Sequence, residues 1–194
     1  MSENETSILR YKLDAGQSKF TVQAFASGLL AGFGHNPTLG IRDFTGEAQG
    51  TSDTLAPSFT DASVRLVIKA SSLAVLDEIK EKDRQEIEHA MRCDVLETAA
   101  YPEIIFQSTN ITATRVAEGR YKARIIGDAS LHGVTRAGLW IQAQVTVNGD
   151  DLRAQGDFTL KQTDYKIKPF SFAGGALKLK DELKFSFDLV GRRE

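Results

Sequence analysis

Hydrophobic and polar residues alternate along most of the chain, and this period of two is typical of β-strands with one buried face. In the run KFTVQAFA, for example, Phe20 and Val22 lie on one face and Thr21 and Gln23 on the other. Strands with one solvent-exposed face and one buried face are typical of antiparallel sheets, so we expect an all-β fold. The pattern predicts about nine strands, in the runs 8–13, 19–26, 39–49, 61–70, 102–108, 120–131, 138–147, 152–160 and 183–189.

One segment, DEIKEKDRQEIEHAMRC at 77–93, lacks this alternation and is rich in residues that favour helices. Asp77 and Glu78 at its start and Arg92 near its end would complement the dipole of a helix over these residues. We therefore expect one external α-helix at about 77–93, with its charged face in solvent. Its thin apolar stripe, which would pack against the strands, consists of Ile79, Ile87, Ala90 and Met91.

Two architectures fit such strands, a two-layer sandwich and a closed barrel. A sandwich core favours bulky side chains, whereas a barrel that holds a guest needs space, and about eight strands can enclose one small ligand. The segment VNGDDLR, 147–153, predicts a tight hairpin turn in either case. Small residues at apolar positions favour the barrel; they are Ala24, Ala62, Ala123, Gly127, Ala129, Ala143, Ala154 and Gly156.

The length of 194 residues predicts a single domain over 1–194, with 1–7 as a flexible tail. A net charge of −2 gives no basic surface for nucleic acid. No stretch approaches the roughly 20 apolar residues of a membrane span, so we expect no stable membrane insertion. The N-terminal residues lack the apolar core of a secretory signal, which predicts a cytoplasmic location. Cys93 is the single cysteine, and this excludes an intrachain disulfide and a cysteine-based metal cage.

Three histidines could act as bases or metal ligands. His35, in the glycine-rich GFGHNP, could bind a metal, act as a base, contact a ligand head group, or only fix a turn. His132 precedes Gly133 and is expected in a turn, although a metal site shared by His35, His132 and Asp164 remains open. His89 is expected in solvent. The motifs GxSxG and the P-loop are absent, and we predict no catalytic residues, no metal and no cofactor.

Five segments resemble the YceI-like, or polyisoprenoid-binding, family in their order and spacing over nearly the whole chain. The resemblance implies an extended, lipocalin-like antiparallel β-barrel of about eight strands with a helix packed outside it. It also implies that a long isoprenoid, such as a quinone tail or a polyprenyl phosphate, is held in an elongated apolar lumen. The segments are YKLDAGQSKFTVQAF, GHNPTLGIRDFTGEAQ, VLETAAYPEIIFQST, GDASLHGVTR and DFTLKQTDYKIKPFSFAGGALKLKDELKFSFDL.

An isoprenoid has almost no group that can form a hydrogen bond. A protein that binds it therefore needs a large apolar surface that is shielded from water. The alternating faces would supply the wall, and GLLAGFGHNPTLG, 28–40, would connect two strands and form a rim. Leu29, Leu30 and Phe33 would give that rim an apolar lip, beside His35. The predicted ligand-binding residues are Phe20, Val22, Leu29, Leu30, Phe33, His35, Leu66, Ile68, Phe106, Ile125, Leu139, Ile141, Phe158, Phe185 and Phe187.

We therefore expect non-enzymatic binding, transport or storage of an isoprenoid, or of a similar long apolar small molecule, in the lumen of the barrel. Two alternatives stay open: a metal-dependent or histidine-based small-molecule enzyme, and a barrel filled with side chains that serves as an interaction module. The face of Gln142 and Gln144 and an exposed sheet edge permit a homodimer, but nothing in the sequence specifies one. An empty lumen would separate the binding hypothesis from the filled barrel.

Overall fold

The computed structural model describes residues 7–27, 36–52, 60–172 and 177–194, and nearly all of them belong to β-strands or the turns between them. One α-helix, α1 (Glu81–Ala90), is followed directly by a π-helical turn at Met91–Val95. The strands are β1 (Ser7–Leu13), β2 (Lys19–Gln23), β3 (Ala26–Ser27), β4 (Thr38–Ile41), β5 (Phe44–Ser52), β6 (Thr60–Lys69), β7 (Leu73–Val75), β8 (Glu103–Ala117), β9 (Arg120–Leu131), β10 (Val134–Asn148), β11 (Asp151–Lys161), β12 (Ser171–Phe172), β13 (Leu177–Leu179) and β14 (Glu182–Arg193).

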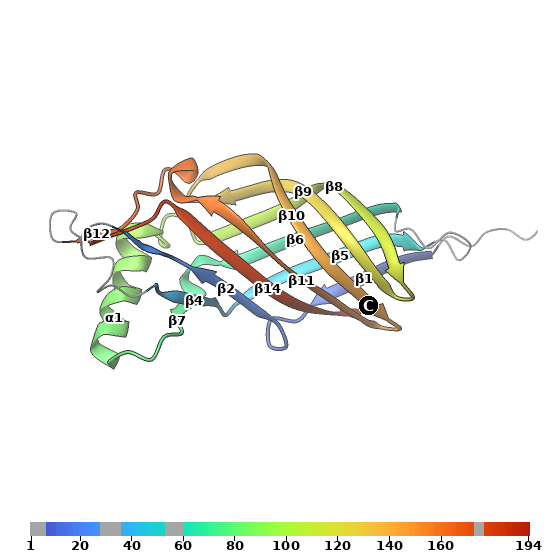
Figure 1. Cartoon of the computed structure of the whole chain (residues 1–194), viewed down its shortest axis with the longest axis horizontal. Coiled ribbons are helices and arrows are strands. Elements are labelled where there is room, and N and C mark those ends of the chain that lie inside the picture. The colour runs from blue at the N-terminus through green and yellow to red at the C-terminus, as the bar shows by residue number, and fades with distance from the viewer. Residues whose placement is uncertain (1–6, 28–35, 53–59, 173–176) are drawn as a thin grey trace, which may run out of the picture.

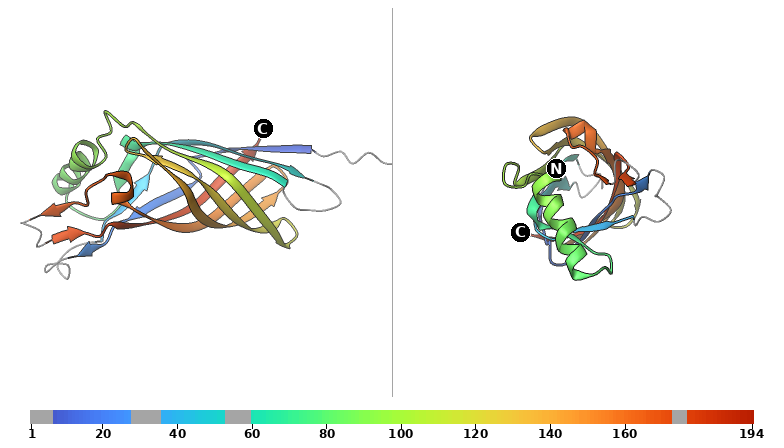
Figure 2. Two further views of the ribbon diagram at one scale, coloured as in Figure 1. Left: turned by 90° about the horizontal axis from the view of Figure 1, so that it is seen from above. Right: turned by 90° about the vertical axis from the view of Figure 1, so that its left-hand side faces the viewer.

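Eight strands close into an antiparallel barrel in the order β1-β5-β6-β8-β9-β10-β11-β14, and β14 pairs with β1 to complete the ring. The barrel is elongated, with its long strands wound obliquely around one axis (Figures 1 and 2). The closing contact joins Tyr11 to Arg193 and Leu13 to Gly191. The predicted antiparallel barrel is therefore confirmed, and the two-layer sandwich is excluded.

The strand β14 has different neighbours at its two ends. Its last residues pair with β1, whereas residues 184–188 pair with β2, so that Phe187 lies opposite Phe20. The chain passes from β1 to β2 through a turn in which the carboxylate of Asp14 accepts the backbone N–H of Gly16 at 2.8 Å. The strands β2, β4 and β7 pair in that order and extend the wall beyond β1, toward the end of the barrel where α1 lies.

The helix α1 lies across that end of the barrel (Figure 2). It begins at Glu81, four residues later than predicted, because Asp77 is held elsewhere: its carboxylate accepts the backbone N–H of Thr38 at 2.8 Å. The acidic residues of the first turn are therefore Glu81 and Asp83, and Arg92 lies in the π-helical turn. Among the described residues, no helix is long and apolar enough to cross a membrane.

Two turns follow the sequence prediction closely. Asn148 and Asp151 pair across the tip of the β10–β11 hairpin, and Gly149 between them has a φ of 59°, which the Asn-Gly sequence favours. The β9–β10 hairpin turns at His132 and Gly133, both with positive φ. A small sheet of β12, β13 and β3 lies near α1 at the same end of the barrel (Figure 1).

Candidate ligand-binding cavity

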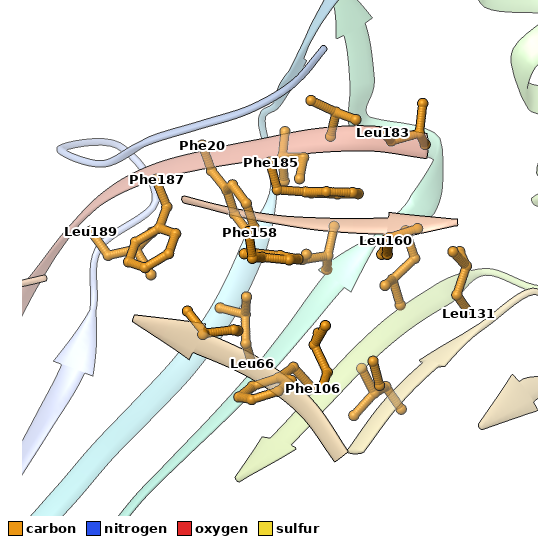
Figure 3. A pocket seen from close by; sticks show the side chains of 18 of the residues that line it. Phe20, Leu66, Phe106, Leu131, Phe158, Leu160, Leu183, Phe185, Phe187 and Leu189 are labelled. Carbon is orange, nitrogen blue, oxygen red and sulfur yellow. The ribbon is translucent and has the colours of Figure 1, made fainter. Parts of the chain in front are cut away.

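A cavity of about 730 Å³ lies inside the barrel and is lined by all eight of its strands and by α1. Figure 3 shows side chains from β2, β11 and β14 on one side and from β6 and β8 on the other, which point into the same space. The volume is within the range of sites that bury a drug-sized ligand. The lining is almost entirely aliphatic and aromatic.

Some inward side chains, such as Phe20, Val22 and Leu66, are buried among their neighbours, whereas others keep part of their surface accessible, as expected of a cavity wall. Along β11, exposed and partly buried residues alternate without a single fully buried position. Phe158 and Leu160 on this strand face inward, yet both keep part of their surface accessible because they border empty space. The lumen is therefore hollow, which argues against the filled-barrel alternative.

Two glycines make room for phenylalanine rings along this wall. A Cβ on Gly127 would lie 2.5 Å from Cζ of Phe106, and a Cβ on Gly156 would lie 2.7 Å from Cζ of Phe187. Each ring thus lies over a glycine of the neighbouring strand and lines the lumen from there. Some of the small residues that suggested a barrel therefore act by letting aromatic side chains lie flat.

The phenylalanines on one side of the cavity form a continuous aromatic surface. Phe158 and Phe185 stack, with ring centroids 4.8 Å apart and an interplanar angle of 8°. Phe20 meets Phe185 and Phe187 edge to face at 6.3 and 6.2 Å. These rings have no polar atom that needs a hydrogen-bond partner, so together they provide apolar surface for an apolar guest.

The structure brings the predicted wall residues together. All eleven that fall on described strands line the cavity, although their contact with a ligand remains a prediction. Leu29, Leu30, Phe33 and His35, predicted to form the rim, lie outside the described residues. The eleven lining residues are Phe20, Val22, Leu66, Ile68, Phe106, Ile125, Leu139, Ile141, Phe158, Phe185 and Phe187.

Sequence reasoning missed other parts of the lining. Leu131, Leu160, Leu183 and Leu189 belong to the same alternating faces, so the same signal could have identified them. The apolar stripe of the predicted helix had marked Ile87 and Met91 as residues that pack against the strands, and both line the cavity. No comparable signal marked the lining residues after β11, because their burial depends on how the barrel end is covered. These residues are Gln162, Tyr165, Ile167 and Phe170.

The end of the cavity near α1 borders solvent. Ile87 on α1 and Phe170 before β12 both line the cavity, yet they are 42% and 44% exposed. The only charged side chains in the lining, among the described residues, are Glu86 and Lys178, and both lie at this end. An apolar molecule could therefore enter here past apolar side chains, with charged groups beside it.

Hydrogen bonds hold α1 against β7 at this mouth. The guanidinium of Arg84 donates to the backbone oxygens of Val75 and Asp77, the latter at 2.9 Å. The carboxylate of Glu88 accepts the backbone N–H of Val75 at 3.0 Å. These charge-assisted bonds therefore hold the helix in place beside the mouth.

Tyrosines mark the two ends of the cavity. Tyr11 lies at the end opposite α1, with Tyr121 nearby, and Tyr165 lies toward the α1 end. Burial raises the pKa of Tyr11 above its usual value, while the charge of Arg193 opposes that rise. Burial likewise raises the pKa of Tyr165. Both phenols therefore stay protonated at neutral pH.

The described histidines do not line the cavity. His132 lies in the β9–β10 turn as predicted, with Nε2 2.6 Å from a carboxylate oxygen of Glu97 and its ring 4.5 Å from that of Tyr101. These contacts join the turn to the segment after α1. His89 is exposed, and its Nδ1 is 3.8 Å from Sγ of Cys93. Within the described ranges, no three His, Cys, Asp or Glu side chains are grouped closely enough to hold a metal.

Comparison with known sequences identifies one domain over most of the chain. A family model described as the YceI-like domain matches residues 11–191. This range begins in β1 and ends in β14, so it includes part or all of each of the eight strands that enclose the cavity. Among curated proteins, no sequence matches the chain.

Solved structures share the fold at low sequence identity. BcnA of Burkholderia cenocepacia is 15% identical with a TM-score of 0.66, over 92% of this chain and 98% of that one. A polyisoprenoid-binding domain from Saccharophagus degradans, implicated in plant cell wall breakdown, is 17% identical with a TM-score of 0.65, over 95% and 98%. The YCEI protein of Campylobacter jejuni is 16% identical with a TM-score of 0.54, over 82% and 86%.

Proposed function

The chain belongs to the YceI-like family, and from that premise we propose that it binds an isoprenoid, or a similar long apolar molecule, inside its barrel. The observation that carries the proposal is the hollow lumen of about 730 Å³ with its aliphatic and aromatic lining. The proposed role is to carry or store this molecule, and it requires no catalytic group. The printed description of the Saccharophagus degradans domain as polyisoprenoid-binding supports the same class of guest.

The energy for such binding comes from removing hydrocarbon from water. Each buried CH₂ contributes about 0.8 kcal/mol, so a five-carbon unit contributes up to about 4 kcal/mol before costs are subtracted. The loss of translational and rotational freedom costs about 4–15 kcal/mol once, whatever the length of the guest. A short prenyl chain therefore binds weakly, whereas a chain of several units binds at micromolar concentration or below.

The phenylalanine surface and the mouth of the cavity near α1 have different roles in the proposed binding. The aromatic wall formed by Phe20, Phe158, Phe185 and Phe187 supplies contact area. The mouth supplies access, since exposed Ile87 leads from solvent to the lumen. A guest is thus taken up end-on, because the barrel wall has continuous strand pairing on its sides.

Native mass spectrometry of the purified protein tests this proposal. After purification in a mild volatile buffer and incubation with a polyprenyl alcohol of about eight isoprene units, we expect one guest for each chain. Organic extraction should remove the added mass and leave the folded chain able to bind again. If the protein stays at the mass of the chain alone at every guest concentration, the proposed function fails.

A further inference from the structure

The far end of the cavity, opposite α1, contains a polar group with which a pure hydrocarbon could not form a hydrogen bond. Tyr11 on β1 lines the cavity and is only 3% exposed. Its hydroxyl is buried and has no hydrogen-bond partner among the described residues. A buried hydroxyl without a partner is unfavourable, and native proteins rarely keep one. The position therefore calls for an acceptor from outside the chain.

The nearby phenol of Tyr121 does not hydrogen-bond to the hydroxyl of Tyr11, and the residues directly across from Tyr11 on the neighbouring strands offer no side-chain acceptor. Its direct neighbour on β5 is Ala48, which in turn lies opposite Val64 on β6. Both of these side chains are apolar and line the same cavity. The neighbour on β14 is Arg193, whose guanidinium is a donor and cannot accept a hydrogen bond. A guest in the lumen is thus in a position to supply the missing acceptor.

The charges near this end restrict the chemistry of that acceptor. The charged side chains of the described lining, Glu86 and Lys178, are both at the α1 end, far from Tyr11 along the barrel. Near the hydroxyl itself, Arg193 and Asp150 act on the pKa of Tyr11 in opposite directions. An anionic head group would therefore lie in an apolar lumen with no cation of the described lining beside it. A neutral oxygen needs only a hydrogen bond from the hydroxyl of Tyr11.

Resting on the proposed function, we propose that the guest carries a neutral hydrogen-bond acceptor, such as a ketone or quinone carbonyl, which accepts the hydroxyl of Tyr11 at the far end of the lumen. The hydrocarbon chain then runs back along the phenylalanine wall toward α1. The guest thus lies with its polar group innermost, and Tyr11 selects it over a hydrocarbon of equal length. The protonated state of Tyr11, which burial favours, makes it the donor in this bond.

Two guests of matched length test the proposal. Farnesylacetone has a terminal ketone on a chain of three isoprene units, and its control is the hydrocarbon in which a methylene group replaces the carbonyl. We expect the wild-type protein to bind the ketone about tenfold more tightly, which corresponds to one neutral hydrogen bond. In Tyr11→Phe that preference should fall to about one, while the affinity for the hydrocarbon, which also reports correct folding, stays unchanged.

Tyr165→Phe is the matched control, because Tyr165 is also a buried phenol of the lining but lies toward α1. Its preference for the ketone should equal that of the wild type. The infrared carbonyl band of bound farnesylacetone adds a direct readout: it should lie at lower wavenumber in the wild type than in Tyr11→Phe, since hydrogen bonding weakens the C=O bond.

The outcomes separate this inference from the proposed function. If the wild type binds both guests equally and Tyr11→Phe changes nothing, the lumen binds apolar chains but the role of Tyr11 is wrong. If the preference disappears in Tyr165→Phe and persists in Tyr11→Phe, the polar group lies at the α1 end and the proposed orientation is overturned. A prenyl phosphate that binds more tightly than the ketone would overturn the neutral class. Binding of no guest at all would overturn the proposed function itself.

Discussion

Phe187 on β14 and Gly156 on β11 are direct cross-strand partners, and the phenyl ring covers the place where a side chain of residue 156 would lie. A Cβ there would also lie 2.2 Å from the backbone oxygen of Gln142 on β10. The pair illustrates how this barrel stays hollow. A large inward residue on one strand is accommodated by the absence of a side chain on the next.

Gly156→Ala should therefore destabilise the protein and disturb its lumen. We expect a loss of about 1–3 kcal/mol in the free energy of unfolding, because the new methyl group meets both a ring and a carbonyl oxygen. Chemical denaturation measures this loss. Gly16→Ala is the control, since a Cβ there meets only the flexible side chain of Asp14, at 3.2 Å. Equal stability of the two variants would contradict the close packing of Phe187 on Gly156.

A second prediction concerns the empty space itself. Ala154 lies on the inner face of β11 and lines the cavity. In Ala154→Phe the ring should occupy the lumen, so the affinity for a long apolar guest should fall at least about tenfold while the free energy of unfolding changes by about 1 kcal/mol or less. Thr159→Phe, on the outer face of the same strand, should bind as the wild type does. If the two variants bind equally well, the guest does not occupy the lumen.

The helix at the mouth gives a third prediction. Arg84→Ala removes two hydrogen bonds to backbone oxygens of Val75 and Asp77 and should cost about 2 kcal/mol of stability. With α1 less firmly held, bound guest should dissociate faster, as stopped-flow transfer to acceptor vesicles would show. Lys82→Ala is the control, because the exposed Lys82–Glu86 pair is worth less than about 1 kcal/mol. A dissociation rate that is the same in all three proteins would exclude α1 from control of the mouth.

The outer wall gives a prediction about acid stability. Arg153 donates two hydrogen bonds, at 2.6 and 2.5 Å, to the carboxylate of Asp188, and Gln155 donates a third at 2.9 Å. The hydrogen bonds from Arg153 are the largest cause that lowers the pKa of Asp188 below its ordinary value of 3.8. Since the folded pKa is the lower one, this stabilisation is fully present above the unfolded pKa and is lost as the pH falls through the folded pKa.

Asp188→Asn should therefore destabilise the protein at about pH 6 and do so less at about pH 2, because the wild-type carboxylate becomes protonated as the pH falls through its lowered folded pKa. Urea denaturation at the two pH values measures the difference. The control is Asp157→Asn, a carboxylate on β11 that has no hydrogen-bond or ion-pair partner among the described residues. A wild-type advantage over Asp188→Asn that stays constant from about pH 6 to about pH 2 would contradict the assignment.

Much of the wall could be predicted from the sequence because the period of a strand is local. Phe158 and Leu160, or Phe185 and Phe187, lie two residues apart and so share a face in any sheet. The same alternation occurs in sandwiches and barrels, however, and closure depends on pairing between Tyr11 and Arg193 at opposite ends of the chain. No local pattern contains that register, so the barrel was predicted only from the small residues at apolar positions and from the family resemblance.

Two other features could not be predicted from the sequence, because they too depend on residues that are far apart in the chain. The start of α1 moved because the carboxylate of Asp77 bonds to Thr38, which is 39 positions away. The unpartnered hydroxyl of Tyr11 depends on which side chains surround it in the closed barrel. The sequence predicts a strand over 8–13, but it does not show whether the phenol of Tyr11 has a hydrogen-bond acceptor once the barrel is closed.

Calorimetric titration with guests of increasing length shows whether the lumen is empty and accepts a long apolar chain. Delipidated protein is titrated with prenyl alcohols of one to four isoprene units. We expect one saturable site per chain, with affinity that rises by at least about tenfold for each added unit until the lumen is full. Affinity that does not change with length, or no saturable binding at any length, would contradict it.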